Sequence, residues 1–268
     1  MEVLKKMLLY TSNMLEILLL PEYLKTRILE RTIKAELKTA HNTAFYSSFI
    51  LAYLIAESEG TSHKEIESAL KALAKIIIGA DIRDEGEDTN TAELTARGDR
   101  IIALGYEELP KYLQTLVKKG QKLAEKGQRL DAKFKNKTAN WQIAYNILSG
   151  KIGVIGGAFC EAIYRTCCKI QQKTPTKQKR QAYFNYGFHS CIAMQIGYDD
   201  MNDLNKDLQD GGFNTYKASS YVLCEDKVKD MQKRAHSELA RGLNAILQSG
   251  INGKWRYCAL TKAMATMI

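Results

Sequence analysis

Apolar residues recur at helical spacing along most of the chain. Between residues 66 and 83, isoleucine and leucine return every three or four positions, which places them on one face of an α-helix. Similar patterns predict helices over residues 2–20, 22–59, 110–130, 141–168, 180–210 and 227–247, the second of which is either one helix or two with a bend near residues 38–42. The chain has only three prolines, at positions 21, 110 and 175, so few helices are interrupted. The pattern predicts an all-α fold in a single domain over residues 1–268.

Short polar segments separate the predicted helices. Thr61 and Ser62, followed by Glu65, have the pattern of a capping box, which predicts a helix start just before residue 66. Residues 89–97 are polar and predict a loop that closes over the acidic residues before them. Residues 133–137 predict a second, solvated loop.

Four glycines interrupt the helix predicted over residues 141–168, at positions 150, 153, 156 and 157. Each costs about 1 kcal/mol relative to alanine in an exposed helix interior, so their presence needs a physical reason. Either another helix packs closely at these positions, or a ligand does. We favour a ligand near Lys151, because exposed backbone N–H groups beside a lysine form an anion site.

Acidic residues recur every four positions in the helix predicted over residues 180–210. Asp199, Asp203 and Asp207 share one face of this helix with Gln195. Like charges at this spacing repel, and apolar neighbours increase the penalty unless a cation lies between the carboxylates. Mg²⁺ is usually held by one or two carboxylates together with substrate phosphates, so the stripe predicts a metal and a phosphate-bearing substrate. Taken alone, a solvated acidic helix face explains the stripe equally well.

A second acidic cluster, Asp84–Asp88, ends the helix predicted over residues 66–83. Asp84 and Asp88 again lie one helical turn apart. If both helices direct their acidic ends at one cavity, two walls of carboxylates hold a small cluster of Mg²⁺ ions and the diphosphate that bridges them. The two clusters together are therefore more specific for this chemistry than either is alone.

The two clusters resemble the hallmarks of the trans-isoprenyl diphosphate synthases and the wider class I terpenoid synthase family, which are Asp-Asp-x-x-Asp motifs on facing helices. Asp84–Asp88 is similar to the first motif, with glutamate in the second place, and Asp199–Asp203 is similar to the second. Tyr186-Gly187 and Ile192–Ile196 resemble the family's Tyr-Gly and Ala-Phe-Gln-Ile run. Lys151–Gly153 resembles its Lys-Thr-Gly turn, and Arg97-Gly98 its Arg-Gly pair. The resemblance covers roughly residues 34–225, in the family's order.

This resemblance implies an antiparallel bundle of about ten or more helices around a central cavity, the isoprenoid synthase fold. It implies that Mg²⁺ is held by Asp84, Glu85, Asp88, Asp199, Asp200, Asp203 and Asp207. It implies that diphosphate is bound by Lys38, His41, Arg97, Lys151 and Gln195, although a lone helical histidine such as His41 is more often a surface residue. The catalytic residues implied are Asp84, Asp88, Asp199, Asp203 and Lys151. An apolar pocket for the prenyl chain is expected from Phe45, Phe49, Ile78 and Gly79.

The chain departs from the family pattern at three places. Asp199 follows Gln195 by four residues instead of three, which aligns Gln195 with the aspartates and approaches the metal triad of terpene cyclases. The Gly-Lys-x-x-Arg-Pro segment that holds isopentenyl diphosphate in elongating members is reduced to Lys38–His41. Gly212 stands where the family has a lysine after the second motif. These departures leave elongation and cyclisation both open.

The resemblance implies an enzyme that ionises an allylic isoprenoid diphosphate with Mg²⁺ as its cofactor. Overall similarity favours a prenyltransferase that passes the prenyl cation to isopentenyl diphosphate or another acceptor. A terpene synthase, in which the prenyl chain attacks itself, is the alternative. A third hypothesis, from another class, is a non-catalytic helical subunit that binds a prenyl synthase.

Charge and cysteine content narrow the partners and the compartment. The net charge of +9 is compatible with anionic ligands and with peripheral membrane contact, and the basic run at residues 173–180 reads as a solvated loop. A basic stripe with interleaved aromatic residues is lacking, so we expect no nucleic-acid partner. Six cysteines occur without a Cys-x-x-Cys pair, which predicts buried thiols in a reducing, cytoplasmic setting. The apolar run at residues 14–20 is too short to span a membrane. The family is commonly dimeric, which implies a homodimer.

Overall fold

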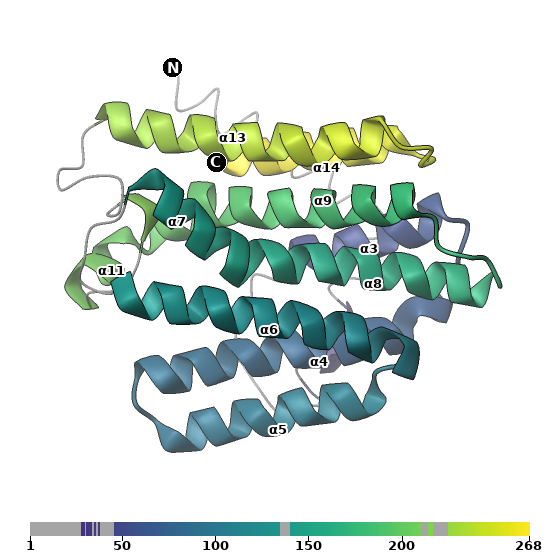
Figure 1. Ribbon diagram of the computed structural model, residues 1–268, viewed down its shortest axis with the longest axis horizontal. Coiled ribbons are helices and arrows are strands. Elements are labelled where there is room, and N and C mark those ends of the chain that lie inside the picture. Colours follow the sequence, from purple (N-terminus) through teal and green to yellow (C-terminus); the bar gives the residue numbers. More distant parts are fainter. Residues whose placement is uncertain are drawn as a thin grey trace. The chain divides into compact units, whose positions relative to one another are not determined.

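The structure is a computed structural model, and it describes residues 28, 29, 31–33, 35, 37, 46–134, 140–210, 214–216 and 225–268. The described residues form helices joined by short turns and contain no β-strand, as the sequence pattern predicts (Figure 1). The helix predicted over residues 2–20 lies outside the described residues, as do Lys38, His41 and Phe45. The helices are α3 (Tyr46–Ser58), α4 (His63–Asp88), α5 (Ala92–Glu108), α6 (Lys111–Phe134), α7 (Trp141–Leu148), α8 (Val154–Ile170), α9 (Lys177–Met194), α10 (Asp200–Asn202), α11 (Leu204–Asp210), α13 (Glu225–Leu247) and α14 (Lys254–Met267), with π-helical turns η1 (Ser149–Gly153) and η2 (Gln195–Asp199).

The chain folds into two compact units. The N-terminal unit consists of Leu18–Leu116 and Ala162–Pro175, and the C-terminal unit consists of Met1–Ile17, Val117–Glu161 and Thr176–Ile268. The boundary between them falls within α6 and again within α8. Each unit is described by itself, and the single domain over residues 1–268 stays a prediction.

Helices α4 and α5 form an antiparallel hairpin in the N-terminal unit. The predicted capping box is confirmed at the start of α4, where the backbone N–H of Ser62 donates to Glu65 Oε2 at 2.9 Å. Small residues bring the two backbones together: a Cβ added to Gly98 would lie 2.6 Å from the backbone O of Gly79, and one added to Gly105 would lie 2.9 Å from the backbone O of Ala72. The two helices are therefore closely packed at these glycines, where the space is filled by backbone and by the side chains of Ile76 and Ile102.

The loop predicted over residues 89–97 is wrong, because α5 begins at Ala92. A tight turn joins α4 to α5, with Asn90 at φ 53° and the backbone N–H of Thr91 donating to the O of Gly86 at 2.8 Å. The buried positions of α5 include Gly98, Ile101 and Gly105, which recur at helical spacing. Glycine carries no apolar side chain, so this buried face was invisible to a pattern of hydrophobic residues.

Helix α9 lies at the centre of the packing in the C-terminal unit, where it contacts η1, η2 and α13. Its Tyr186 is fully buried, packs edge-on against the ring of Tyr257 at 5.2 Å, and shares a 2.9 Å hydrogen bond with Thr261 Oγ1. Burial raises the pKa of Tyr186 well above its ordinary value. The phenol is therefore a neutral anchor between α9 and α14.

Among the described helices, one stretch could cross a membrane by length and composition alone. This is the helical stretch Trp141–Ile170, and the core helix of a soluble protein passes the same test. Ile147 and Leu148 are buried in the C-terminal unit, and Ala162 and Ile163 are buried in the N-terminal unit. The stretch is therefore weak evidence for a membrane span.

Candidate active site

Two π-helical turns carry the candidate site residues of the C-terminal unit. In η1 the backbone N–H of Val154 donates to the O of Ser149, and in η2 that of Asp200 donates to the O of Gln195. These hydrogen bonds span five residues instead of four, a geometry that is rare and is frequently found at functional sites. Lys151 belongs to η1, and Gln195 and Asp199 belong to η2. Because α9 contacts both turns, residues far apart in the sequence are brought into one region.

The π turn η2 changes the neighbours of Gln195. Its Nε2 donates to Asp199 Oδ2 at 2.6 Å, as expected for residues four apart, and to Asp200 Oδ1 at 2.7 Å. The prediction of one continuous helix over residues 180–210 is therefore wrong. The helix widens into the π-helical turn η2, and Asp203 interrupts it between α10 and α11. The α-helical hydrogen bonds continue beyond η2, because the backbone N–H of Asp203 donates to the O of Asp199 and that of Asp207 donates to the O of Asp203, each at 2.9 Å.

Asp199 lies in an environment that disfavours its charge. Burial raises the pKa of Asp199, and the carboxylates of Asp203 and Asp207 raise it further. The hydrogen bond from Gln195 and the positive charge of Lys151 act in the opposite direction. A cation bound beside Asp199 would remove this conflict, so the oxygen donors fit a hard divalent ion. Among the described residues, no group of three or more His, Cys, Asp or Glu side chains is already assembled as a metal site.

Asp200 is only 5% exposed, unlike its neighbours Met201 and Asn202. Its Oδ2 accepts hydrogen bonds from the backbone N–H of Thr215 at 3.0 Å and from Thr215 Oγ1 at 2.5 Å. Burial raises the pKa of Asp200 to about 6, against the hydrogen bonds from Gln195 and Thr215. These contacts favour a structural role for Asp200 over the metal ligation predicted for it.

Asn214 and Thr215 are functional candidates that the sequence reasoning missed. Asn214 is fully buried, and its Nδ2 donates to the backbone O of Asp200 at 2.6 Å and to Asp207 Oδ2 at 2.8 Å. The pair therefore holds two predicted metal residues in place. Their only sequence signal is their position just after the acidic motif, close to Gly212, which stands where the family has a lysine. Gly212 itself lies outside the described residues.

Lys151 is paired with an acid that the sequence reasoning also missed. Its Nζ lies 2.9 Å from Oδ2 of Asp131, on α6. Asp131 and Glu125 are the only acidic residues in α6. The presence of an acid in such a basic helix is the sequence signal that could have identified Asp131.

The four glycines around Lys151 are explained by close helix packing, which corrects the preference for a ligand. A Cβ added to Gly150 would lie 3.0 Å from the Cα of Gly127 on α6. The other three face α9: added Cβ atoms on Gly153 and Gly157 would meet phenylalanine rings at 2.8 Å, and one on Gly156 would lie 2.6 Å from the backbone O of Gly187. Anion binding by Lys151 itself stays a prediction.

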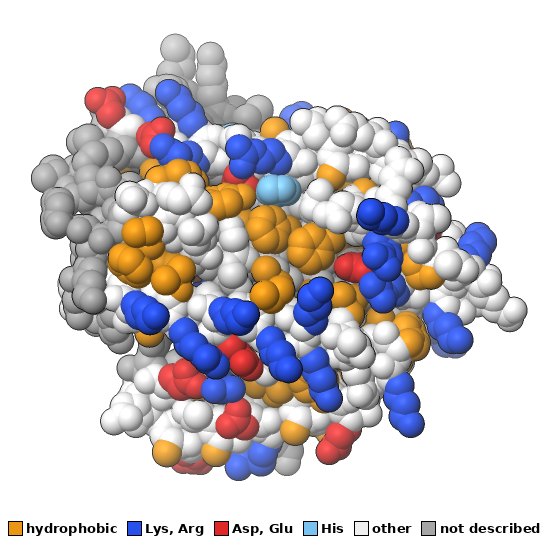
Figure 2. Space-filling model, viewed as in Figure 1, with side chains coloured by type: hydrophobic (Ala, Val, Ile, Leu, Met, Phe, Trp, Pro, Cys, Tyr) orange, Lys and Arg blue, Asp and Glu red, His pale blue; other side chains and the backbone are white. Residues whose placement is uncertain are grey.

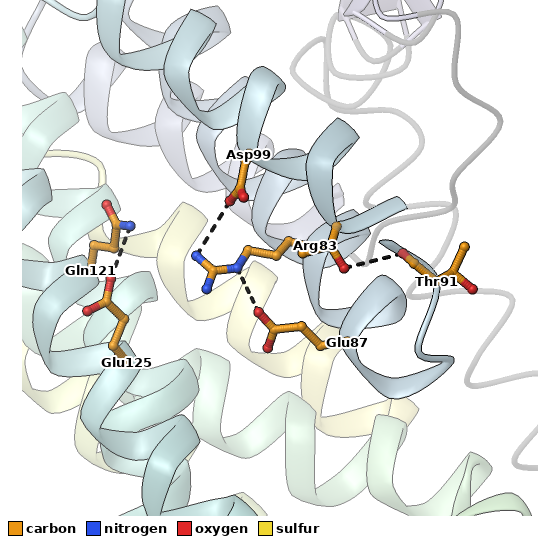
Figure 3. A network of polar contacts seen from close by, with 7 residues as sticks. Arg83, Glu87, Thr91, Asp99, Gln121 and Glu125 are labelled. Atoms are coloured by element: carbon orange, nitrogen blue, oxygen red, sulfur yellow. Dashed lines mark hydrogen bonds and ion pairs between the residues drawn. The ribbon is translucent and has the colours of Figure 1, made fainter. Parts of the chain in front are cut away.

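The first acidic motif lies at the end of α4 in the N-terminal unit. Asp84 is half-buried and Glu85 is exposed, and the side chain of Asp88 is outside the described set. Arg83 lies between Glu87, which it contacts at 2.8 Å, and Asp99 on α5, at 3.6 Å (Figure 3). Arg83 thus pairs with Glu87, which lies inside the motif but is not one of its predicted metal ligands.

The remaining predicted residues have mixed outcomes. Arg97 belongs to α5, and its Nη2 donates to the backbone O of Leu37 at 3.3 Å. Ile78 is buried as expected of an apolar residue, and the side chain of Phe49 is outside the described set. Gly79 faces α5, because an added Cβ would lie 2.8 Å from the backbone O of Gly98. Helix packing therefore explains why this residue is small, and its assignment to the prenyl pocket stays a prediction.

Comparison with solved structures identifies the fold. The chain is similar to a polyprenyl synthase from Roseobacter denitrificans (TM-score 0.71, 12% identity, covering 90% of this chain and 95% of that one). It is similar to a geranylgeranyl pyrophosphate synthetase from the archaeon Geoglobus acetivorans (TM-score 0.70, 16% identity, 91% and 96% covered). It is also similar to a polyprenyl synthase from Caulobacter crescentus complexed with calcium and isoprenyl diphosphate (TM-score 0.72, 11% identity, 90% and 93% covered). No family model and no curated protein matches the sequence. The chain therefore has the all-α fold of polyprenyl synthases, and the predicted isoprenoid synthase fold is confirmed.

Proposed function

We propose that the protein is a Mg²⁺-dependent prenyltransferase that ionises an allylic isoprenoid diphosphate and transfers the prenyl group to isopentenyl diphosphate or another acceptor. One observation carries this proposal: within a polyprenyl synthase fold, helix α9 contacts both η1, which carries Lys151, and η2, which carries Gln195 and Asp199 of the acidic motif. A lysine beside crowded carboxylates is suited to a ligand that carries both phosphate and metal.

Each residue has a defined part in the proposed reaction. Asp84 and Asp88 of the first motif, with Asp199 and Asp203 of the second, would hold the metal against the diphosphate. Lys151 supplies fixed positive charge to the phosphate oxygens, and Gln195 keeps Asp199 oriented through its 2.6 Å hydrogen bond. Mg²⁺, when bound, would neutralise the charge that builds on the departing diphosphate. Released diphosphate can itself accept the proton that the product loses, so no side chain is needed as the base.

A substrate assay tests the proposal and its alternative. Purified protein with Mg²⁺ is incubated with geranyl, farnesyl or geranylgeranyl diphosphate, each with and without labelled isopentenyl diphosphate. Longer labelled diphosphates are the expected product. Hydrocarbons or alcohols formed without isopentenyl diphosphate would establish the terpene synthase alternative, which is favoured by the alignment of Gln195 with Asp199.

A subunit without activity would give neither product. Calorimetry with a non-hydrolysable allylic diphosphate separates this third hypothesis from an enzyme acting on an untried substrate. Mg²⁺-dependent binding that Asp199→Asn abolishes supports an enzyme, whereas an absence of binding favours the partner subunit. The homodimer and the cytoplasmic location remain proposals, and sedimentation of the purified protein tests the first.

Peripheral contact with an anionic membrane is supported by the surface of α6. From Val117 onward α6 belongs to the C-terminal unit, and its two acidic residues there, Glu125 and Asp131, are half-buried. Six exposed residues of the same segment are basic: Lys118, Lys119, Lys122, Lys126, Arg129 and Lys133. Figure 2 shows Lys and Arg side chains in a row over the region where Figure 1 draws α6. Such a face is attracted to anionic lipids. Co-sedimentation with vesicles containing phosphatidylserine should detect binding that salt reverses, and equal binding to neutral vesicles would contradict it.

A further inference from the structure

Asp131 and Lys151 form an ion pair whose position is fixed by the backbone. Helix α6 and the turn η1 cross with Gly127 against Gly150 and Lys151, so closely that a Cβ on Gly127 would lie 2.5 Å from the carbonyl carbon of Gly150. Asp131 follows Gly127 by four residues, which is one helical turn. The crossing therefore delivers the Asp131 carboxylate to the Lys151 ammonium, with 2.9 Å between Oδ2 and Nζ.

Both partners are largely withdrawn from solvent. The side chain of Asp131 is 17% exposed and that of Lys151 is 28% exposed. A pair in this environment is screened less than one on the surface, so the carboxylate competes strongly with any other anion for the lysine. Lys151 is also close enough to Asp199 to favour its charged form. The lysine is thus paired with Asp131 and lies in the same region as the second acidic motif, since α9 contacts both η1 and η2.

We propose that Asp131 is the resident counter-ion of Lys151 and makes the site select phosphate ligands that arrive with a divalent metal ion. The proposal rests on the proposed function in taking Lys151 as a phosphate-binding residue. A metal-free diphosphate must compete with Asp131 for the ammonium and is repelled by the aspartates of the second motif. A metal-bound diphosphate brings positive charge for these carboxylates, so the same acids favour it. Asp131 is a positioning residue, because it acts through Lys151.

Titration of inorganic pyrophosphate into the full-length protein tests this inference without any need for turnover. In the presence of EDTA, Asp131→Asn should bind pyrophosphate about tenfold more tightly than the original protein, because one negative charge beside the lysine is gone. In excess Mg²⁺ the difference should shrink to less than about threefold, because the metal already offsets that charge. The selectivity for metal-bound over metal-free pyrophosphate should therefore fall.

Two further variants make the result specific. Glu125→Gln removes the same charge from the same helix, where Glu125 accepts a hydrogen bond from Gln121 at 3.2 Å, and it should leave the metal-free affinity unchanged. In a Lys151→Ala background, Asp131→Asn should have no effect. If Asp131→Asn is unfolded by circular dichroism, Asp131→Ala replaces it.

Three outcomes would overturn the inference: unchanged metal-free affinity in Asp131→Asn, an equal gain in Glu125→Gln, or a gain that persists without Lys151. The proposed function can fail separately. If no allylic diphosphate is turned over but the pyrophosphate results hold, the role of Asp131 stands and only the prenyl transfer is lost.

Discussion

Asp200 and Thr215 show how a residue of the acidic motif can support the fold through its own hydrogen bonds. From sequence, Asp200 is the second carboxylate of an acidic motif and a predicted metal ligand. In the structure its side chain is buried and holds the main chain and hydroxyl of Thr215. The sequence could not distinguish these roles, because the π turn η2 moves Asp200 relative to Gln195 and Asp199.

Replacing Thr215 by valine keeps the shape and removes the hydroxyl donor. Because a buried carboxylate would lose one of its hydrogen bonds, Thr215→Val should lower the free energy of unfolding by about 1–3 kcal/mol. Urea denaturation measures this change. Thr115→Val, at an exposed position of α6, should change it by less than about 0.5 kcal/mol. Equal effects at the two positions would show that the hydroxyl of Thr215 does not support Asp200.

The sequence predicts that the cysteines are small buried hydrophobic residues. The structure confirms this for Cys160, Cys167 and Cys168. Cys160 and Cys167 are 1% and 0% exposed, and burial raises the pKa of Cys167 and of Cys191 to about 12. Since the thiolate is the reactive form, a raised pKa makes these thiols inert near neutral pH.

Alkylation with iodoacetamide at pH 8 tests this environment. In the native protein we expect Cys258 to be modified well before Cys160 and Cys167, which are buried, and before Cys191, which is also half-buried but whose pKa is raised to about 12. Peptide mass spectrometry measures the extent at each site. Raising the pH to 9.5 should add little at Cys167, because that pH is still below its pKa of about 12. In urea all four should react alike, and equally fast labelling of Cys167 in the folded protein would contradict its burial.

At the scale of elements, glycine explains where the sequence prediction succeeded and failed. The apolar spacing located α4 and α6 because their buried faces carry large side chains such as Ile66, Leu70 and Leu113. It missed the start of α5, whose buried face includes Gly98 and Gly105. It also misjudged Gly150, where the space is filled by the backbone of α6. Glycines at a close helix contact recur at helical spacing but leave no apolar signal, and the sequence does not show which helix fills the space beside them.

Adding one methyl group to the α4–α5 hairpin should therefore destabilise it. In Gly98→Ala the new Cβ would meet the backbone N of Arg83 and the backbone O of Gly79 at 2.6 Å, which requires the helices to separate. We expect a loss of about 1–3 kcal/mol in the free energy of unfolding. Gly250→Ala is the matched control, because nothing lies within 4 Å of the new atom there. A neutral or stabilising effect of Gly98→Ala in thermal unfolding would refute the tight packing.

At the scale of the whole molecule, the fold was predictable and the joint use of the two acidic motifs was not. Two motifs, a lysine turn and long helical periods predict the polyprenyl synthase fold, which the structural similarities confirm. The motifs belong to different compact units, Asp84 to the N-terminal and Asp199 to the C-terminal one. Whether both motifs bind the same ligand is tested by measuring ligand binding in variants of each motif.

A ligand gripped by both motifs would couple them. We expect Mg²⁺ with a geranyl bisphosphonate to raise the melting temperature of the original protein, and Asp84→Asn or Asp199→Asn alone to remove most of that increase. The double variant should lose little more, because either substitution already breaks the shared site. Differential scanning fluorimetry measures the shifts. Independent, additive losses would show two separate sites.

The crossing of Gly127 with Gly150 determines how precisely η1 positions the side chain of Lys151. No side chain lies between the two main chains there, because both residues are glycines. The position of the Lys151 ammonium therefore depends on the backbone geometry of this crossing, which leaves little room for movement. A methyl group on Gly127 would clash with the backbone of Gly150 and Lys151, and the shift of η1 that relieves this clash would lengthen the short charged hydrogen bond of Lys151. Two glycines thereby set the place at which the partly buried charge of Lys151 would meet a phosphate ligand.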